Sequence, residues 1–208
     1  MVTAAPTPTE APLKPLVILD SGFSTFKGKY DSGPQLGFGV VVENQNTTWI
    51  ASQVDLSITF LDDHGDIIDT TDASFAAILP GQRVAWADTL SDYSGDWTSM
   101  ASMELSLSEP EWEEYPDTAG AFSFTKTKMT RDILGSIDVT ARLASTFVEE
   151  VDSPYIVVVF YRADKIIGGG YTFLEHARDG AAVKISTDGY PKVDNADLYA
   201  NLSFMSLY

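Results

Sequence analysis

The 208-residue sequence has no cysteine, only two histidines and no long run of apolar residues. Without cysteine the chain cannot form a disulfide, a thiolate metal site or a cysteine nucleophile. The longest apolar runs, such as residues 156–161, are far shorter than the roughly 20 residues that a membrane-spanning helix needs. We therefore predict no membrane-spanning segment in this chain.

Positive charge is also scarce, because 30 acidic residues face 13 lysines and arginines and give a net charge of −17. Such a field repels phosphate, which argues against nucleic acid and anionic membranes as partners. High solubility alone would account for the charge. The acids are nevertheless uneven, since residues 16–108 hold 13 acidic and three basic residues and residues 109–116 hold four glutamates. One hypothesis is that this part recognises a basic protein or polycation, while residues 117–208 act as a spacer.

Long helical patterns are missing as well, and short strand patterns take their place. Four apolar residues alternate with more polar ones, which is the period of a half-buried strand: Val54, Leu56, Ile58 and Phe60. Turn signals such as Pro80-Gly81 separate these runs. In the later part of the chain we expect strands at 122–128, 137–143, 155–161, 166–173, 181–186 and 198–207.

Two stretches about one hundred residues apart follow the same plan: SITFLDDHGDIID at 57–69 and IVVVFYRADKIIG at 156–168. Phe60 then matches Phe160 and Gly81 matches Gly180, with the one lost residue in the polar turn. Further matches place Gly37 on Gly135, and Met103, Leu105 and Leu107 on Leu202, Phe204 and Ser206. Apolar positions that stay in phase while turns change length predict a duplicated domain.

Six or seven short strands with frequent turns in about 90 residues indicate an antiparallel β-sandwich. We therefore predict an all-β protein of two tandem antiparallel immunoglobulin-like β-sandwich domains, at 16–108 and 117–208. A disordered tether rich in proline, threonine and alanine is expected at 1–15, and an acidic linker at 109–116. Trp112 and Tyr115 are expected to pack against one of the domains rather than bind a ligand.

The stretch ITFLD at 58–62 closes one expected strand before an Asp-His-Gly turn, and VVFYR at 158–162 holds that place in the second copy. LPGQRVAW at 79–86 adds a Pro-Gly turn that leads into the next strand, where the second copy keeps Asp179-Gly180. These features resemble the FxLYD domain, a small immunoglobulin-like sandwich of exported bacterial and archaeal proteins. The resemblance implies a cell-surface or envelope module, and it brings no catalytic residues to carry over.

The first 15 residues lack the basic and apolar regions of a signal peptide. Their composition is typical of an extended, solvated tether, although an ordinary flexible terminus would look the same. We therefore expect an extracytoplasmic protein, anchored to the cell surface or envelope as a lipoprotein would be.

Two groups of carboxylates invite a metal interpretation. The first, Asp62, Asp63 and Asp66, surrounds Gly65, but counting from Asp62 puts alanine where an EF-hand loop needs its twelfth-position glutamate. Aspartates that cap a turn explain the same residues. The second group is Asp88, Asp92 and Asp96. We predict no metal and no cofactor at either place.

Catalysis finds little support in the sequence. His64 lies in an expected exposed turn and His176 at a strand end, and neither adjoins a nucleophile motif. Paired carboxylates for glycoside hydrolysis are plentiful, so a carboxylate-dependent hydrolase stays as a distant third alternative. We therefore predict that the protein is not an enzyme.

The aromatic residues leave one positive possibility, a surface on which sugar rings stack. Trp49, Tyr93 and Trp97 lie near expected loops and are the candidate binding residues, whereas Trp86 lies in an expected strand and is assigned to the core. The leading prediction is a non-enzymatic binding, adhesion or spacer module whose partner is a protein or polysaccharide at the cell envelope. The alternative is a carbohydrate-binding protein that uses these aromatic residues.

Overall fold

The computed structural model describes residues 12–27, 33–91, 96–115, 120–133, 135–190 and 192–207. All sheets in these ranges are antiparallel, and two short 3-10 turns are the only helical elements there, which confirms the all-β expectation. The described residues include no helix that could span a bilayer. We call residues 17–114 the first half of the molecule and residues 122–207 the second half.

The first half packs two sheets into a sandwich. Its elements are β1 Val17–Lys27, β2 Pro34–Glu43, β3 Trp49–Asp62, β4 Ile67–Ile78, β5 Arg83–Leu90, η1 Trp97–Ser99, β6 Met100–Leu107 and β7 Glu111–Glu114. One sheet has the order β1-β2-β5 and the other the order β4-β3-β6, with β7 beside the start of β3. Alternate residues of both sheets point inward, and their core includes Phe38, Ile58, Phe60, Phe75 and Trp97.

The second half repeats this plan. Its elements are β8 Phe122–Arg131, β9 Ile137–Ser145, β10 Val151–Asp152, β11 Tyr155–Arg162, β12 Lys165–Phe173, β13 His176–Ala177, β14 Ala182–Thr187, β15 Asn195–Asn201 and η2 Phe204–Leu207. The sheet orders are β14-β9-β8 and β12-β11-β15, which repeat those of the first half strand for strand. A small ladder of β10 and β13 lies where the ends of β3 and β4 pair in the first half.

Backbone details repeat at the spacing that the sequence predicts. The positive φ angles of Gln53 and Ser153 kink β3 and the β10–β11 segment at equivalent points. The register shifts directly after Phe60 in one half and directly after Phe160 in the other. The amide of Gly81 donates to the carbonyl of Asn44, and at the same offset the amide of Gly180 donates to Leu143.

The structure corrects two of the predicted matches. Val42 pairs with Val84 and Ala141 pairs with Val183, so an offset of 99, not the 98 implied by Gly37 and Gly135, relates β2 to β9. In the last strand, Phe60 pairs with Met103 and Phe160 pairs with Ala196. Met103, Leu105 and Leu107 therefore correspond to Ala196, Leu198 and Ala200, not to Leu202, Phe204 and Ser206. The reason is that β15 ends at Asn201, and residues 204–207 form the 3-10 turn η2.

The two hairpins that raised the metal question differ in their turns. In the first half, the Asp62 carboxylate accepts the amides of His64 and Asp66, each within 2.9 Å, and thereby closes a longer loop. In the second half, Arg162 pairs with Lys165, and Ala163 and Asp164 both have positive φ angles, of 49° and 60°. Two consecutive residues with positive φ are the mark of a type I′ turn, which needs no carboxylate cluster.

The predicted boundaries also change. Glu111–Glu114, expected as a linker, forms β7 and pairs with Trp49–Ser52 of β3, so it belongs to the first sandwich. At the expected tether, residues 1–11 lie outside the described part of the chain. Lys14 is held to the first half, since its amide donates to the Asn46 side chain at 2.8 Å and its carbonyl accepts from it.

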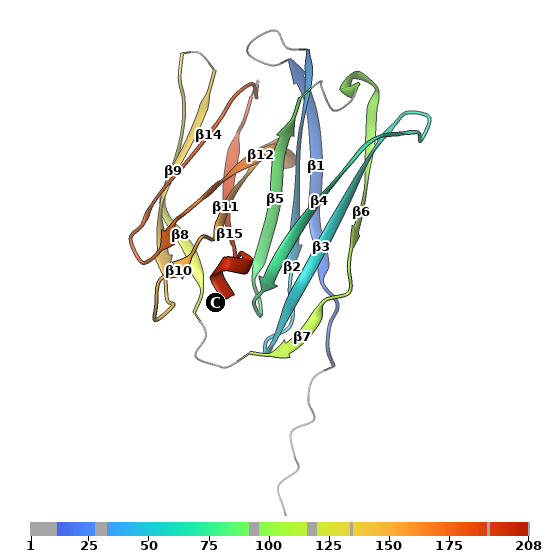
Figure 1. Cartoon of the computed structure of the whole chain (residues 1–208). Helices are drawn as coiled ribbons and strands as arrows, with labels where there is room; N and C mark the ends of the chain where they lie inside the picture. Colours follow the sequence, from blue (N-terminus) through green and yellow to red (C-terminus); the bar gives the residue numbers. More distant parts are fainter. Residues whose placement is uncertain are drawn as a thin grey trace, which may run out of the picture.

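The two halves pack face to face, so that the four sheets form successive layers from left to right in Figure 1. The outer faces of β1-β2-β5 and β12-β11-β15 form this seam, whose apolar centre is buried: Val41, Ala85, Ala87, Val157, Val159 and Ile166. Two glycines allow the close approach, since a Cβ atom on Gly22 would collide with the Ile166 carbonyl and one on Gly169 with the side chain of Ala87. The halves are therefore joined as one body rather than strung on a linker.

Candidate binding groove

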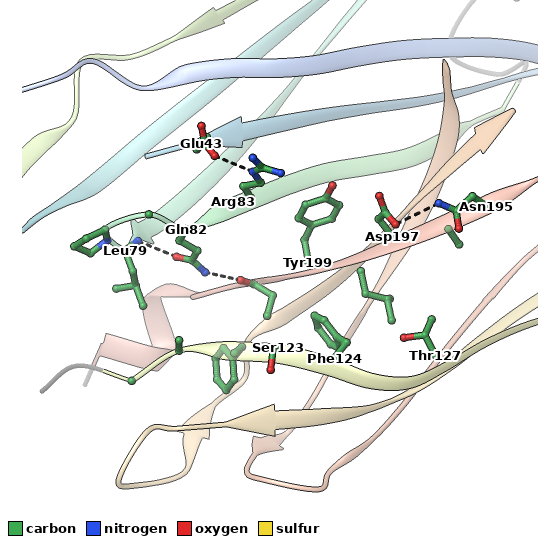
Figure 2. A pocket seen from close by; sticks show the side chains of 18 of the residues that line it. Glu43, Leu79, Gln82, Arg83, Ser123, Phe124, Thr127, Asn195, Asp197 and Tyr199 are labelled. Atoms are coloured by element: carbon green, nitrogen blue, oxygen red, sulfur yellow. Dashed lines mark hydrogen bonds and ion pairs between the residues drawn. The ribbon is translucent and has the colours of Figure 1, made fainter. Parts of the chain in front are cut away.

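Both halves line a groove of about 1120 Å³ (Figure 2). β8 forms one bank, β15 runs along the middle, and the Pro80-Gly81 turn with the start of β5 closes the other side. Arg83 and Glu43 lie above Tyr199 in this view, and Ser123, Phe124 and Thr127 lie below it. The groove exists because the second sandwich is open between its edge strands β8 and β15.

Among the described residues, one edge of β15 has no strand partner. There β15 is the last strand of its sheet and pairs with β11 alone. The Gln82 side chain donates to the carbonyl of Ala200 at 2.9 Å, so the backbone of Ala200 points away from β11 and into the groove. Backbone groups of an antiparallel strand alternate between its two edges. The amide and carbonyl groups of Ala196 and Leu198 therefore point into the groove as well.

The opposite bank, β8, has features that protect an edge strand from pairing. Its register with β9 breaks between Thr125 and Lys128, and Lys126 takes a φ of 54°. The side chains of Lys126 and Lys128 are exposed. Bulges and lysines are common devices against unwanted strand addition. Of the two strands that flank the groove, β15 therefore has the more regular free edge.

The floor of the groove is apolar. It is lined by partly buried side chains that also pack against the core of the second half: Phe122, Phe124, Met129, Ala196 and Leu198. These residues come from the inward faces of β8 and β15, where no further strand covers them within the described part of the chain. A ligand in the groove would thus meet both apolar side chains and free backbone groups.

The charged residues of the lining are mostly acidic. Arg83 donates to Glu43 at 2.8 Å, and this hydrogen bond lowers the pKa of the Glu43 carboxyl. Asp194 accepts from the amide of Ala163 and pairs with Lys192 at 3.2 Å, and these contacts lower its pKa. Asp197 has a weaker contact, a donation from the Asn195 amide at 3.5 Å. The lining therefore holds three carboxylates and one guanidinium group.

The aromatic residues proposed from the sequence do not form a surface together. Trp97 is completely buried between the sheets of the first half, where its ring lies 5.5 Å from that of Phe60 and its indole N–H donates to Ser91. This contradicts its assignment to an exposed binding surface. The prediction was wrong because the turn η1 directs the Trp97 side chain toward the core, although the residue lies beside a loop. Trp49 is half-buried at the start of β3, and Tyr93 lies outside the described residues.

An aromatic cluster that the sequence reasoning missed lies across the seam. Trp86 of β5 stacks on Tyr171 of β12 with ring centres 5.1 Å apart and an angle of 26° between the planes. Tyr155 and Phe173 complete the group, with ring centres 4.2 Å apart. Tyr171 is 39% exposed and Phe173 is 53% exposed. Trp86 was assigned to the core, and it does pack there in part, but its ring also contacts the second half.

Local hydrogen bonds occupy several of the acidic candidates for metal binding. Asp62, Asp63 and His64 have ligand-type atoms within 4.8 Å of one another, and two of the three residues are exposed. Asp62 is occupied by the turn amides, and Asp96 accepts from the amide and hydroxyl of Thr98 as the cap of η1. Burial raises the pKa of Asp88, which accepts from the amide of Thr89. Asp92 lies outside the described residues.

Both histidines are exposed and paired with aspartates. His64 lies 2.7 Å from Asp63, and His176 lies 2.9 Å from Asp152. The hydrogen bond with Asp152 raises the pKa of His176. In the part of the chain that the structure describes, no hydrogen bond joins either imidazole to a hydroxyl group. Among the described residues, neither pair is therefore joined to a nucleophile in the arrangement of a hydrolytic triad.

Neither a scan against models of protein families nor a search of curated proteins finds a match. Among solved structures, the crystal structure of red sea bream transglutaminase matches with a TM-score of 0.28 and 7% sequence identity. The match covers 88% of this chain and 29% of the transglutaminase, so the chain spans less than a third of that protein's length. A likeness at this level assigns neither a family nor an activity to the chain.

Proposed function

We propose that the chain is a non-enzymatic, exported or cell-surface protein that binds a partner at the cell envelope through a rigid pair of FxLYD-like sandwiches. The observation that carries this proposal is the groove that both halves line, because it exists only while the seam holds the halves together. A stiff pair of sandwiches can also set the distance between the surface and another module. Binding and spacing are thus compatible roles for the same body.

Several polar contacts keep the two sides of the groove in a fixed relation. The side chain of Asn201 donates to the carbonyl of Ala85 at 2.7 Å and accepts from its amide at 3.3 Å, and both groups are buried. Tyr190 fills the space beside Gly37 and Gly168, and its hydroxyl contacts Thr89 across the seam at 2.8 Å. A preformed groove loses little conformational entropy when a partner binds, which favours a binding role.

A role outside the cytoplasm is proposed from the sequence, namely from the composition of residues 1–15 and the FxLYD resemblance. The test is to expose intact cells that produce the protein to protease and to follow the chain with an antibody. We expect cleavage while a cytoplasmic marker stays intact. Protection of the chain together with that marker would remove the extracytoplasmic part of the proposal.

The binding role needs a separate test with the purified full chain. We expect retention on envelope fractions of the producing cells that survives about 0.15 M salt, because burial in a groove is screened less than contact between surface charges. Retention that disappears at this salt concentration would reduce the interaction to general attraction by the net charge of −17.

A second candidate function, carbohydrate binding, is favoured by the cluster of Trp86, Tyr155, Tyr171 and Phe173. Aromatic faces stack against the apolar faces of sugar rings, and the cluster lies beside the carboxylate of Asp88, whose charge acts on Tyr171. A panel of envelope polysaccharides would test it with Tyr171→Ala, and with Trp49→Ala as the matched control. Sugar binding that Tyr171→Ala abolishes and Trp49→Ala leaves intact would support this candidate, and no binding by the wild type would end it.

A further inference from the structure

We propose that the groove takes an extended peptide that pairs with the free edge of β15, and that apolar residues alternate with basic residues in this peptide. The proposal rests on the binding role proposed above and names the chemistry of the partner. In strand addition, main-chain hydrogen bonds supply affinity and alternate side chains supply specificity. Both sets of contacts can be traced to residues in the groove.

The main-chain part lies along Ala196 and Leu198. Two contacts fix which backbone groups face outward: Gln82 donates to Ala200 from the groove side, and the amide of Leu174 in the β11–β12 ladder donates to Pro154. Pro154 and every second residue after it thus bond to β12. This leaves Tyr155 and every second residue after it to bond to β15. The Gln82 amide already takes the place of a strand neighbour at one end of β15, and a peptide would continue the same pairing.

The side-chain part follows from the alternation of β15. Ala196 and Leu198 face the apolar core beside Phe124 and Met129, so every second residue of an added strand would meet this apolar floor. The residues between them would lie on the face of Asp197 and Tyr199. That face carries the excess of carboxylates, and Asp197 has no cationic partner among the described residues. A basic residue is the complement that this position favours.

The choice of β15 rather than β8 rests on the state of their edges. The bulge and exposed lysines of β8 oppose strand addition and repel a basic peptide. By contrast, β15 pairs with β11 over seven residues without a register shift and contains no proline or lysine. The peptide therefore adds to the sheet that forms the seam and packs over β8 only with its side chains.

The first experiment uses the full chain with synthetic octapeptides. The probe alternates valine and lysine, and the controls are a peptide of the same composition in Val-Val-Lys-Lys blocks and a peptide that alternates valine and glutamate. We expect only the alternating valine–lysine peptide to bind at about 0.15 M salt and to slow hydrogen exchange at the amides of Ala196 and Leu198. Equal binding of the block peptide, or protection elsewhere, overturns the proposal.

N-methylated peptides test the pairing itself without altering the protein. Antiparallel pairing requires the valine N–H groups to face β15, and parallel pairing requires those of lysine. Methylating one of these two sets should weaken binding at least about tenfold, the equivalent of one lost hydrogen bond, while the other set has little effect. Equal effects of the two sets overturn strand addition.

Two variants locate the site. Ala196→Pro removes an N–H that faces the groove and leaves the bonds to β11 in place, and Ala196→Val is its matched control because it retains the N–H. We expect the proline variant alone to lose the peptide about tenfold or more. Asp197→Asn should weaken the binding of the valine–lysine peptide, and it should have no effect on the part of this binding that does not depend on salt. Undiminished binding by Ala196→Pro, shown to be folded by its circular dichroism, overturns the site.

The remaining outcomes separate this inference from the proposed function. Envelope retention that persists in Ala196→Pro removes the groove as the site and leaves the binding role standing. Light scattering could instead show a dimer of the free chain that Ala196→Pro converts to a monomer. A second copy would then be the occupant of the groove, and the proposal of a peptide would be overturned.

Discussion

The first half keeps β3 as one strand of 14 residues, whereas the second half divides the equivalent chain into β10 and β11. The kink is the same in both, at Gln53 and at Ser153. The difference lies in the next residue, which is Val54 in one half and Pro154 in the other. Proline has no N–H to donate to a ladder, so the kink becomes a break. One substitution at a shared bend thus changes the length of a strand without changing the topology.

The halves also differ in what lies beside these equivalent segments. β7 pairs with Trp49–Ser52 in the first half. In the second half the 3-10 turn η2 lies beside β10, with the Ser206 hydroxyl donating to the carbonyl of Asp152. The inward faces stay alike while the edges diverge, because inward side chains must fill a shared core and edges meet solvent. Differences in ligand binding between the halves should therefore be sought at their edges.

The largest expected effect tests whether the two cores are equivalent. Phe60→Ala and Phe160→Ala should each lower the free energy of unfolding by about 3–5 kcal/mol, because both rings are fully buried. Chemical denaturation of the two variants measures this. Phe173→Ala, at a ring that is 53% exposed, is the control and should cost much less. Costs that differ greatly between Phe60 and Phe160 would break the equivalence.

The seam should make the two halves unfold together. Asn201→Ala leaves the buried amide and carbonyl of Ala85 unpaired and should cost about 1–3 kcal/mol. All four tryptophans lie in the first half, so their fluorescence reports its unfolding, and circular dichroism reports both halves. The unfolding transitions seen by fluorescence and by circular dichroism should coincide in the wild type. The control Asn195→Ala, at an exposed position, should shift neither transition. Separate transitions in the wild type would show that the halves fold independently.

The shared kink should respond alike in the two halves. Gln53→Gly and Ser153→Gly should each raise stability by about 0.5–1 kcal/mol, because glycine adopts φ angles of 55° and 48° without the steric cost of a side chain. Thermal unfolding compares them with Ser57→Gly in the regular part of β3, which should be destabilising. A gain in one half alone would mean that only one kink is strained.

The smallest effect distinguishes the halves by pH. His176 and Asp152 are cross-strand partners in the second half, and Ala77 and Ser52 hold the equivalent places in the first. Because the Asp152 hydrogen bond raises the pKa of His176, its stabilising effect is complete below the ordinary pKa of about 6.5 and is lost as pH rises through the raised value. Proton NMR should show His176 titrating above that ordinary value, and Asp152→Asn should lower its pKa. An unchanged titration in Asp152→Asn would contradict the assignment.

Parts of the seam could have been anticipated from the sequence. The run LGFGVVV at 36–42 and the run IVVVF at 156–160 are apolar at every position, and a strand that is apolar on both faces is expected to be covered on both. The groove gave no comparable signal, because its lining comes from segments that are distant along the chain, such as Gln82, Phe124 and Asp197.

The placement of the aromatic residues shows the same limit. Alternation predicts that Trp86 points toward the core, and its ring does pack there in part. Whether it also meets Tyr171 depends on how the two halves are oriented across the seam, which no local pattern specifies. The prediction that Trp97 is exposed was wrong for a related reason, because a short turn after a loop can direct a side chain either toward the core or toward solvent.

Apolar alternation and turn residues determined the strand identities, since both are set by residues close together in the chain. The return of these local patterns about one hundred residues later determined the duplicated antiparallel plan. Pairing with distant strands decided three further features. These are the offset that relates β2 to β9, which is 99 and not 98, the existence of strand β7, and the residue at which β15 ends. The seam, the groove and the aromatic cluster arise only when two finished sandwiches pack face to face. Their geometry depends on shape complementarity between surfaces, which is a property of the folded halves and not of any segment of the sequence.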